Sequence, residues 1–296
     1  MIRRAAGITP SGRTVVITGA SSGLGREAAL HLERIGFQVC AGVRATADGE
    51  RLLAESSAGR LHPLRFDVTE PGQIRQAVDE VARRLGEVGL WGLVNNAGVA
   101  QPGPLECLSG EQFRRQLETN VIGQVETIQG FLPLLRAGRG RIVNVTSGLG
   151  RVALPYLGAY AAAQFAKEAI SDSLRRELRP FGVTVSVVQP GAIRTPIWEK
   201  LDQAGEELID GVPEPTAALY RAAFRAFLRR NARQVHRSRT TPGQYARTVA
   251  RALTAARPRT RYPVGPDVRI ASLAARLLPD NLIDRNLAAL VPPRDG

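Results

Sequence analysis

The sequence predicts a doubly wound α/β fold of the Rossmann type, in which helices cover both faces of one parallel sheet. Two observations predict it: short β-branched runs alternate with longer segments of helical period, and a glycine-rich turn follows the first run. The chain has 296 residues, of which 44% are hydrophobic and 23% charged, so its composition excludes collagen, coiled coils and disulfide scaffolds. Because we find neither an internal repeat nor a low-complexity linker, we expect a single domain.

The expected elements follow one another in a regular order. The strand candidates are residues 14–18, 38–43, 61–66, 90–94, 141–146 and 183–188. The helix candidates between them are residues 24–35, 71–85, 111–135 and 158–179. A last helix at 244–256 leads to a run at 261–264 that would close the sheet.

Three segments stand outside this alternation. Residues 1–11 form an N-terminal extension to a single domain that spans 12–296. Residues 192–240 hold one predicted amphipathic helix, 217–230, and an insertion this long after a strand is more often functional than filler, so we expect a substrate lid. The tail, 267–296, has leucines at helical spacing and is expected to pack on the body or on a second subunit.

The net charge of +13 is a property of one segment. Between Pro215 and Pro266 twelve arginines occur without any Asp or Glu, which leaves the rest of the chain at only +1. A nucleic-acid partner would rest on this net charge alone and gains no support from the aromatic residues of the segment, so we expect none. Arg221, Arg225 and Arg229 recur every four residues. They could attract an anionic substrate or carrier, or simply form a solvated helix face.

Residues 18–25 connect the first strand to the first helix and read Thr-Gly-Ala-Ser-Ser-Gly-Leu-Gly. Glycine permits positive φ and lets backbone N–H groups approach a pyrophosphate at the positive end of a helix. A tight strand-to-helix connection would by itself explain such a turn. Further motifs follow it in order, namely Asp67-Val68, Asn95-Asn96-Ala97-Gly98, Asn120, Ser147, Tyr160, Gln189-Pro190-Gly191 and Thr195-Pro196.

Together these motifs resemble the short-chain dehydrogenase/reductase family, specifically its retinol-dehydrogenase-like and 17β-hydroxysteroid-dehydrogenase-like branch. The resemblance covers residues 14–198, roughly two thirds of the chain. It implies a dinucleotide with its pyrophosphate on the glycine turn, its adenine beside Asp67 and Val68, and its nicotinamide beside the segment after Pro190. The implied cofactor residues are Gly19, Ser21, Ser22, Gly23, Leu24, Gly25, Arg44, Asp67, Val68, Asn95, Ala97, Gly98, Pro190, Gly191, Ile193 and Thr195.

Arg44 bears on the choice between NAD and NADP. A carboxylate at the end of the second strand would accept the 2′-hydroxyl of NAD and repel a 2′-phosphate. Here that end reads Ala-Gly-Val-Arg over residues 41–44, with no acid and with a guanidinium suited to phosphate. We therefore expect NADP(H), and a merely solvated Arg44 is the alternative.

The resemblance also implies catalytic roles. Tyr160 would be the general acid and base, Ser147 would orient the carbonyl, and Asn120 would support a water relay. One departure matters, because this chain has Gln164 where the family has a lysine four residues after the tyrosine. That lysine would hold the nicotinamide ribose and lower the pKa of the tyrosine, whereas a glutamine can only hydrogen-bond the ribose.

Lys167 is the nearest lysine to this position in the sequence. It lies on nearly the same helix face as Tyr160, about 10.5 Å further along the axis. Its side chain would lean back toward Gln164, so partial compensation stays open, although the resemblance implies an apolar residue at this position.

These residues predict an NADP-dependent oxidoreductase that interconverts a hydrophobic alcohol and its ketone or aldehyde. The alternative is a degenerate member of the family without redox turnover. Such a protein would bind a nucleotide, or act as a non-redox cyclase, isomerase or dehydratase through Tyr160 and Ser147. The neutral Gln164 keeps this alternative open. The spacing of the cysteines matches no metal site, so we expect no metal.

Location and assembly can also be predicted. Neither an apolar run of roughly 20 residues nor a secretory apolar core is found, so we expect a cytoplasmic protein without a membrane span. The predicted helices 111–135 and 158–179 resemble the paired interface helices of the family, so we expect a homodimer or homotetramer. The apolar positions expected to need cover there are Phe131, Leu134, Ile170 and Leu174.

Overall fold

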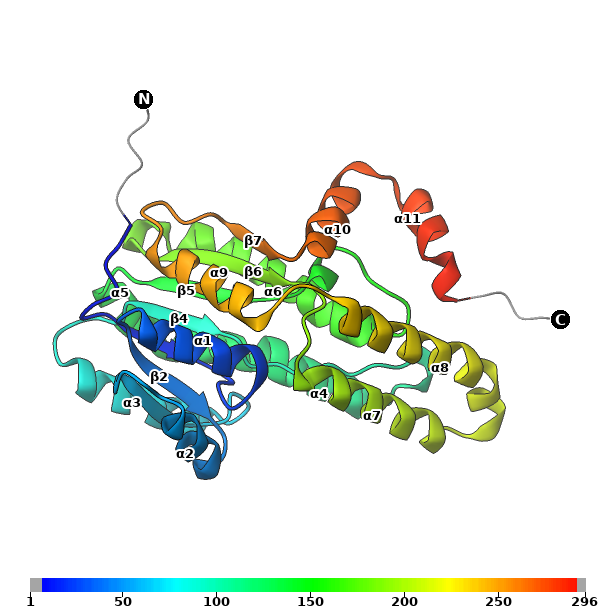
Figure 1. Cartoon of the computed structure of the whole chain (residues 1–296), viewed down its shortest axis with the longest axis horizontal. Coiled ribbons are helices and arrows are strands. Elements are labelled where there is room, and N and C mark those ends of the chain that lie inside the picture. The colour runs from blue at the N-terminus through cyan, green and yellow to red at the C-terminus, as the bar shows by residue number, and fades with distance from the viewer. Residues whose placement is uncertain (1–6, 292–296) are drawn as a thin grey trace.

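The computed structural model describes residues 7–291 and contains one seven-stranded parallel sheet (Figure 1). The strands are β1 (Thr14–Ile17), β2 (Gln38–Val43), β3 (Leu61–Arg65), β4 (Gly92–Asn95), β5 (Arg141–Val145), β6 (Thr184–Pro190) and β7 (Arg261–Val264). Their order across the sheet is β3-β2-β1-β4-β5-β6-β7, so the predicted doubly wound fold is confirmed. The order reverses between β1 and β4. Open α/β sheets bind their ligands at such a reversal, beyond the carboxyl ends of the strands.

Helices cover both faces of this sheet (Figure 1). The helices of the first face are α1 (Gly23–Arg34), α2 (Thr46–Ala54) and α9 (Pro242–Thr254). Those of the second face are α3 (Pro71–Leu85), α5 (Gly123–Ala137) and α6 (Gly158–Glu177). The remaining helices lie to the right of the helices just named in the view of Figure 1. They are α4 (Gly110–Leu117), α7 (Pro196–Gly211), α8 (Glu214–Arg237), α10 (Pro266–Leu277) and α11 (Asp280–Leu287).

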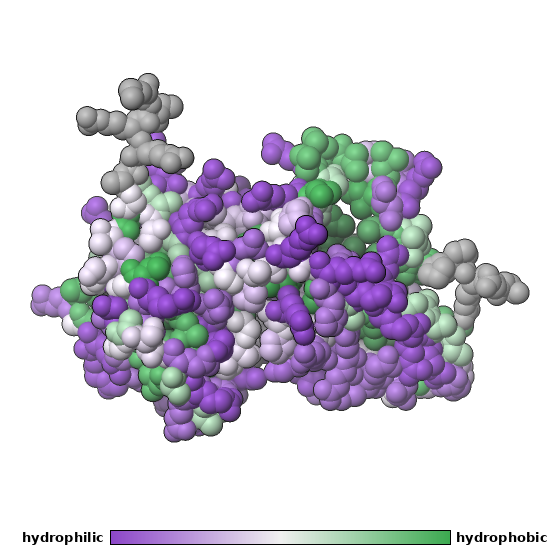
Figure 2. Space-filling view, in the orientation of Figure 1, coloured by the Kyte–Doolittle hydropathy of each residue, from purple (hydrophilic) through white to green (hydrophobic). Residues whose placement is uncertain are grey.

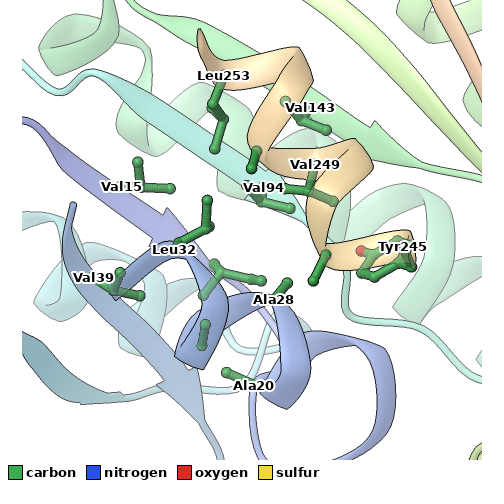
Figure 3. Close-up of a cluster of buried hydrophobic side chains, with 14 of the residues drawn as sticks. Val15, Ala20, Ala28, Leu32, Val39, Val94, Val143, Tyr245, Val249 and Leu253 are labelled. Carbon is green, nitrogen blue, oxygen red and sulfur yellow. The ribbon is translucent and has the colours of Figure 1, made fainter. Parts of the chain in front are cut away.

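The alternation of side chains along the strands builds a separate core on each face. Val15 and Ile17 of β1 belong to the core beneath α1 and α9, whereas Val16 between them belongs to the core beneath α3 and α5. On the first face, Ala28 and Leu32 of α1 pack with α9 over the middle of the sheet (Figure 3). The strands β1, β4 and β5 are therefore fixed from both sides, which holds their carboxyl ends in place.

Two details differ from the sequence prediction on the helical layers. The helix expected over residues 111–135 is interrupted by a π-turn, Glu118–Ile122, between α4 and α5. One extra residue per turn does not alter the apolar pattern enough to be seen in sequence, and such turns are frequent at functional sites. Helix α2 was not expected, because only Gly49 and Leu52 of its nine residues are buried.

The insertion after β6 contains two helices where one was predicted. Helices α7 and α8 are separated by Val212 and Pro213, and they pack against each other as a hairpin (Figure 1). Their buried side chains form a third core with Tyr156 and Leu157, which lie just before α6. The Tyr156 ring lies 5.4 Å from that of Phe224 and 5.3 Å from that of Phe227. The hairpin is thus anchored to the loop that precedes Tyr160.

The two ends of the chain differ in how they contact the body. Of the predicted extension, residues 1–6 lie outside the described part, whereas the Ile8 N–H donates to the Thr254 carbonyl at 2.7 Å and so belongs to the body. The last five residues of the predicted tail also lie outside it. The described tail forms α10 and α11, and Val268 buries its side chain against the body. Among residues 7–291, no helix is both long and apolar enough to cross a bilayer.

Candidate active site

One cavity of about 1440 Å³ lies beyond the carboxyl ends of the strands. Pockets for a single drug-sized ligand span roughly 300–1,000 Å³, so this cavity has room for a dinucleotide and a substrate together. All but one of the predicted site residues line it. They are Gly19, Ser21, Ser22, Gly23, Leu24, Gly25, Arg44, Asp67, Val68, Ala97, Gly98, Asn120, Ser147, Tyr160, Gln164, Pro190, Gly191, Ile193 and Thr195.

The glycine turn has the shape of a cradle for a phosphate group. Gly19 adopts a φ of 65°, and a Cβ there would lie 2.8 Å from the Cα of Ala97. A Cβ on Gly25 would lie 2.1 Å from the Gly19 carbonyl oxygen, so backbone packing requires glycine at both positions. Helix α1 begins here without a side-chain cap at Ser22 and without an acid in its first turn. Its first N–H groups are therefore available to a pyrophosphate.

Asn95 is the exception, and its prediction as a cofactor residue is not supported by its position. Its side chain is 3% exposed and does not line the cavity, because the amide donates to Asn144 Oδ1 at 2.9 Å and links β4 to β5. The next residue, Asn96, faces the other way and does line the cavity. Its amide donates to the Thr18 and Gly19 carbonyls at 3.0 and 3.1 Å, and its Oδ1 accepts from the Tyr245 hydroxyl. Asn96 thereby holds the glycine turn in place.

Ser147 and Tyr160 both line the cavity. Ser147 follows β5, and its Oγ accepts the Leu149 N–H at 3.2 Å, which leaves its own O–H free to donate. Tyr160 lies in the first turn of α6. Burial raises the pKa of the Tyr160 phenol, and a hydrogen bond with Ser147 offsets part of this effect. The pair can therefore present a protonated phenol and a hydroxyl to one oxygen atom.

Asn120 lies in the π-turn and is 1% exposed. Its Oδ1 accepts the Val99 N–H at 2.8 Å and its amide donates to the Val99 carbonyl at 3.0 Å. Both polar atoms of the side chain are thus used to fix the loop after β4. The side chain positions the cofactor-side loop, and the water relay predicted for Asn120 remains a prediction.

Gln164 follows Tyr160 by one helical turn and is 2% exposed. Its Oε1 is buried and accepts no hydrogen bond from the protein. A buried acceptor without a donor costs free energy, so it fits a ligand hydroxyl such as that of a ribose. Gln164 can therefore bind a nicotinamide ribose, but it cannot supply a charge to Tyr160.

Glu168 is a central residue that sequence reasoning missed. Its Oε1 accepts the Thr146 hydroxyl and the Gln189 amide, each at 2.8 Å. Its Oε2 accepts Arg261 Nε at 2.8 Å and lies 3.5 Å from Arg151. One carboxylate on α6 thus joins the carboxyl ends of β5 and β6 to the first residue of β7. The contacts fix Ser147 and Pro190, which directly follow Thr146 and Gln189, relative to the helix that carries Tyr160.

The loop after β6 is held by residues that were also not predicted. The Ala192 N–H donates to Asp267 Oδ2 at 2.8 Å, and the Ser238 hydroxyl donates to the Ala192 carbonyl. The Trp198 indole donates to the Ile193 carbonyl at 2.7 Å. Asp267 comes from α10 and Ser238 directly follows α8, so the α7–α8 hairpin and the tail both contact the segment after β6.

The far half of the cavity has apolar walls. Figure 2 shows hydrophobic side chains gathered over α10 and α11 beside a hollow, and Ile270 of α10, which is 69% exposed, lines the cavity there. Further apolar side chains that line the cavity include Leu149, Val152, Leu154, Leu157, Trp198, Leu201, Phe227, Val268, Leu278, Ile283, Leu287 and Leu290.

The arginine stripe on α8 is largely paired within the chain. Arg221 makes two hydrogen bonds to Glu214, and Arg225 contacts Glu206 at 2.7 Å and Asp210 at 2.8 Å. Only Arg229 of the three has no such contact with an acid among the described residues. These ion pairs favour the interpretation of the stripe as a solvated face that joins α8 to α7.

Comparison with known proteins agrees with this geometry. Residues 13–206 match the model of the short chain dehydrogenase family. The chain belongs to the short-chain dehydrogenase/reductase family. It is 42% identical over 272 residues to the 3-amino-tetrahydro-pyrrolizinone reductase of Xenorhabdus hominickii, covering 92% of this chain and 93% of that protein. It is 39% identical over 297 residues to retinol dehydrogenase 5 of Mus musculus, covering 99% and 93%.

Solved structures of the family share the fold. A short chain dehydrogenase/reductase from Burkholderia phymatum in complex with NAD superposes with a TM-score of 0.77 at 24% identity, covering 98% of this chain and 99% of that one. A short chain dehydrogenase from Burkholderia cenocepacia in complex with NADP gives a TM-score of 0.72 at 24% identity, covering 97% and 100%. The predicted retinol-dehydrogenase-like membership is therefore confirmed by the relatives, and the chain is an oxidoreductase of this family.

Proposed function

We propose that this oxidoreductase uses NADP(H) to interconvert a hydrophobic alcohol and its ketone or aldehyde, with Tyr160 as the general acid and base. The observation that carries the proposal is that Tyr160 and Ser147 line one cavity with the glycine turn. When bound, the nicotinamide supplies or accepts a hydride. The protein must hold the carbonyl beside it and move one proton at the carbonyl oxygen.

Ser147 and Tyr160 divide this work. The Ser147 O–H donates to the carbonyl oxygen and orients it, and Tyr160 gives that oxygen its phenolic proton during reduction. Because burial raises the pKa of Tyr160, the phenol stays protonated at neutral pH and reduction is the easier direction. Oxidation requires the tyrosinate, so its rate should rise as the pH approaches the pKa of the phenol.

Arg44 supports NADP(H) as the cofactor. It lines the cavity just beyond β2, is 74% exposed, and lies 3.9 Å from Asp67 Oδ2. An exposed ion pair of this kind is worth at most about 1 kcal/mol, so the guanidinium can turn to a 2′-phosphate at little cost. The end of β2 itself carries no carboxylate, and a carboxylate at this position would favour the 2′-hydroxyl of NAD.

The lid and the tail support a hydrophobic substrate. We assign residues 192–240 as the lid, and the tail from residue 267 as a second wall, because both supply apolar side chains to the cavity beyond Tyr160. Such walls stabilise an apolar ligand by about 25 cal/mol per Å² buried and offer a polar substrate few partners.

The cofactor assignment is tested by calorimetric titration. We expect NADP⁺ to bind at least tenfold more tightly than NAD⁺, and the Arg44→Asp variant to reverse the preference. The exposed Arg51, which pairs with Asp48 on α2, offers the control Arg51→Asp. Equal dissociation constants for both cofactors in the unmodified protein would contradict the assignment.

The reaction is tested by following NADPH absorbance with ketones and aldehydes of increasing chain length. We expect kcat/KM to rise with apolar length, and Tyr160→Phe to lose more than a hundredfold in kcat while still binding NADPH. Binding of NADPH without turnover of any carbonyl or alcohol would instead favour the non-redox alternative, in which Tyr160 and Ser147 serve a cyclase, isomerase or dehydratase.

We also propose that the chain assembles into a homodimer or homotetramer, but through other residues of these helices than Phe131. Phe131, predicted as an interface residue, is fully buried in the core of its own subunit. The large apolar residues that are exposed within the predicted helices are Ile122, 43% exposed, and Phe165, 44% exposed. Light scattering of the Phe165→Glu variant should show a smaller particle than the unmodified protein, and an unchanged mass would contradict this contact.

A further inference from the structure

Lys167 is one of only two lysines in the chain, and it is buried. Its side chain is 2% exposed and lines the same cavity as Tyr160 and Gln164. These three are the residues of α6 that line the cavity. Their spacing of four and then three residues places them in one stripe along the helix. Lys167 is thus the only cation that α6 presents to the site.

The position of Ser171 shows which way this stripe faces. Ser171 follows Lys167 by one turn, and its hydroxyl donates to the Lys167 carbonyl at 2.6 Å and accepts the Asn144 amide. Asn144 in turn accepts from Asn95 at the end of β4. The stripe therefore lies against the ends of β4 and β5. A lysine side chain on a helix leans toward the N-terminus, which here is the direction of Gln164 and Tyr160.

The ammonium of Lys167 lacks an anionic partner in the part of the chain that the structure describes. No carboxylate among residues 7–291 forms a salt bridge with it. The adjacent Glu168 is directed elsewhere, because its oxygens accept Thr146, Gln189 and Arg261. A buried cation without a partner is unfavourable, so the group either loses its proton or takes a counter-charge from the cavity.

We propose that Lys167 supplies the positive charge beside Tyr160 and binds the cofactor ribose together with Gln164, so that the cation of this active site comes from position 167. The inference rests on the proposed redox function of Tyr160. Gln164 then acts as a neutral ribose ligand, and Lys167 as the charge that stabilises the tyrosinate.

The proton balance of this arrangement is complete. In reduction, Tyr160 transfers its phenolic proton to the carbonyl oxygen as the carbonyl carbon receives a hydride from the reduced nicotinamide. The products are one alcohol, one oxidised nicotinamide and one tyrosinate. The Lys167 ammonium stabilises the tyrosinate until a proton from water restores the phenol. In oxidation the same steps run in reverse, and the ammonium makes the tyrosinate accessible at lower pH.

The titration of Lys167 agrees with this role. Burial lowers the pKa of Lys167 to about 7, and the Glu168 carboxylate acts in the opposite direction. Arg151 and Arg261 face Glu168, and Tyr160 lies on the same stripe as Lys167. A lysine that titrates near neutral pH is charged below this range and neutral above it, so the support that Lys167 gives to the tyrosinate should be lost as the pH rises through its titration.

The first test observes Lys167 directly and needs no turnover. With [ε-¹³C]lysine in the full chain, only two side-chain signals are expected, and a Lys200→Arg variant assigns the remaining one to Lys167. We expect addition of NADP⁺ to shift the Lys167 signal and to change its titration midpoint. A Lys167 signal that does not respond to saturating NADP⁺ would overturn the proposal, whether or not a substrate has been found.

The second test moves the charge. We expect Lys167→Met, which keeps the chain length and is apolar, to lower kcat by a hundredfold or more and to raise the NADPH dissociation constant about tenfold. The double variant Gln164→Lys/Lys167→Met should recover at least tenfold in kcat, because it places an ammonium one turn closer to Tyr160. Arg176→Met, which removes an exposed cation from the same helix, is the matched control and should change neither quantity.

The outcomes separate the two proposals. If the unmodified enzyme reduces carbonyls and Lys167→Met retains kcat and NADPH affinity within threefold, Lys167 has no such role, while the redox function stands. If the unmodified protein turns over no carbonyl or alcohol, the redox function fails, and the NADP⁺ response of Lys167 together with the NADPH affinity of Lys167→Met still decides whether the ammonium binds the cofactor.

Discussion

Replacement of Lys167 by methionine should make the protein more stable, and by an amount that depends on pH. The pKa of Lys167 is lowered from 10.5 to about 7 by burial. The folded protein therefore binds fewer protons than the unfolded chain between these two values, and its stability rises with pH across this window. Each pH unit is worth up to about 1.4 kcal/mol for one group. The cost of the buried lysine is thus fully present below pH 7, where it reaches roughly 5 kcal/mol as an upper limit, and it disappears above pH 10.5.

Urea unfolding of both proteins between pH 7 and pH 10 measures this difference. Other groups that titrate in the range are common to both proteins and cancel in the comparison. We expect Lys167→Met to be several kcal/mol more stable at pH 7, and this advantage to shrink steadily toward pH 10. A stability difference that does not change with pH would show that the lysine is not destabilised by burial. A destabilising residue that is also required for turnover is the trade-off expected of an active-site group.

Three further results are expected. Glu168→Ala should lower the free energy of unfolding by about 3–5 kcal/mol in urea, because it leaves the buried donors of Thr146 and Gln189, and the partly exposed Arg261, without their acceptor. Glu177→Ala on the exposed end of the same helix should stay within about 0.5 kcal/mol. Gly25→Ala should abolish NADPH binding, measured by the fluorescence of the bound nucleotide, because its Cβ would lie 2.1 Å from the Gly19 carbonyl oxygen; retained affinity would show that the turn can open. Phe224→Ala should remove about 3–5 kcal/mol of packing between α8 and Tyr156 and so speed tryptic cleavage within the lid, and an unchanged cleavage rate would argue against that anchor.

The sheet and the glycine turn could be predicted from the sequence, because their signals are local. A parallel strand buried on both faces is an apolar run of a few residues, and a phosphate turn needs glycines within eight positions. The prediction of Asn95, where the neighbouring Asn96 is the residue that lines the cavity, shows the limit of such signals. Successive residues at a strand end point to opposite faces, so an error of one position moves a side chain from the sheet to the cavity.

The contacts that fix the site could not be predicted, because they join distant parts of the chain. Glu168 meets Thr146 and Gln189, which are 22 and 21 residues away, and Arg261, which is 93 residues away. Asp267 meets Ala192 across 75 residues. Nothing in the local pattern distinguishes these acids from the others of an amphipathic helix. The π-turn and the second lid helix were missed for a related reason, since their boundaries depend on packing rather than on period.

Helix α6 carries two stripes of functional side chains. Glu168 and Asp172 form one stripe, which is bound to Arg261 on β7 and fixes the helix on the strand ends. Tyr160, Gln164 and Lys167 form the other, which faces the cavity. Lys167 and Glu168 are adjacent in sequence but lie about 100° apart around the helix. Glu168 is the only acid adjacent to Lys167 in the sequence. Because of this angle, and because Arg151 and Arg261 contact its carboxylate, Glu168 does not neutralise the Lys167 ammonium. The charge of the lysine is thereby left for whatever enters the cavity, and the same carboxylate that fixes the strand ends also keeps the ammonium available to Tyr160.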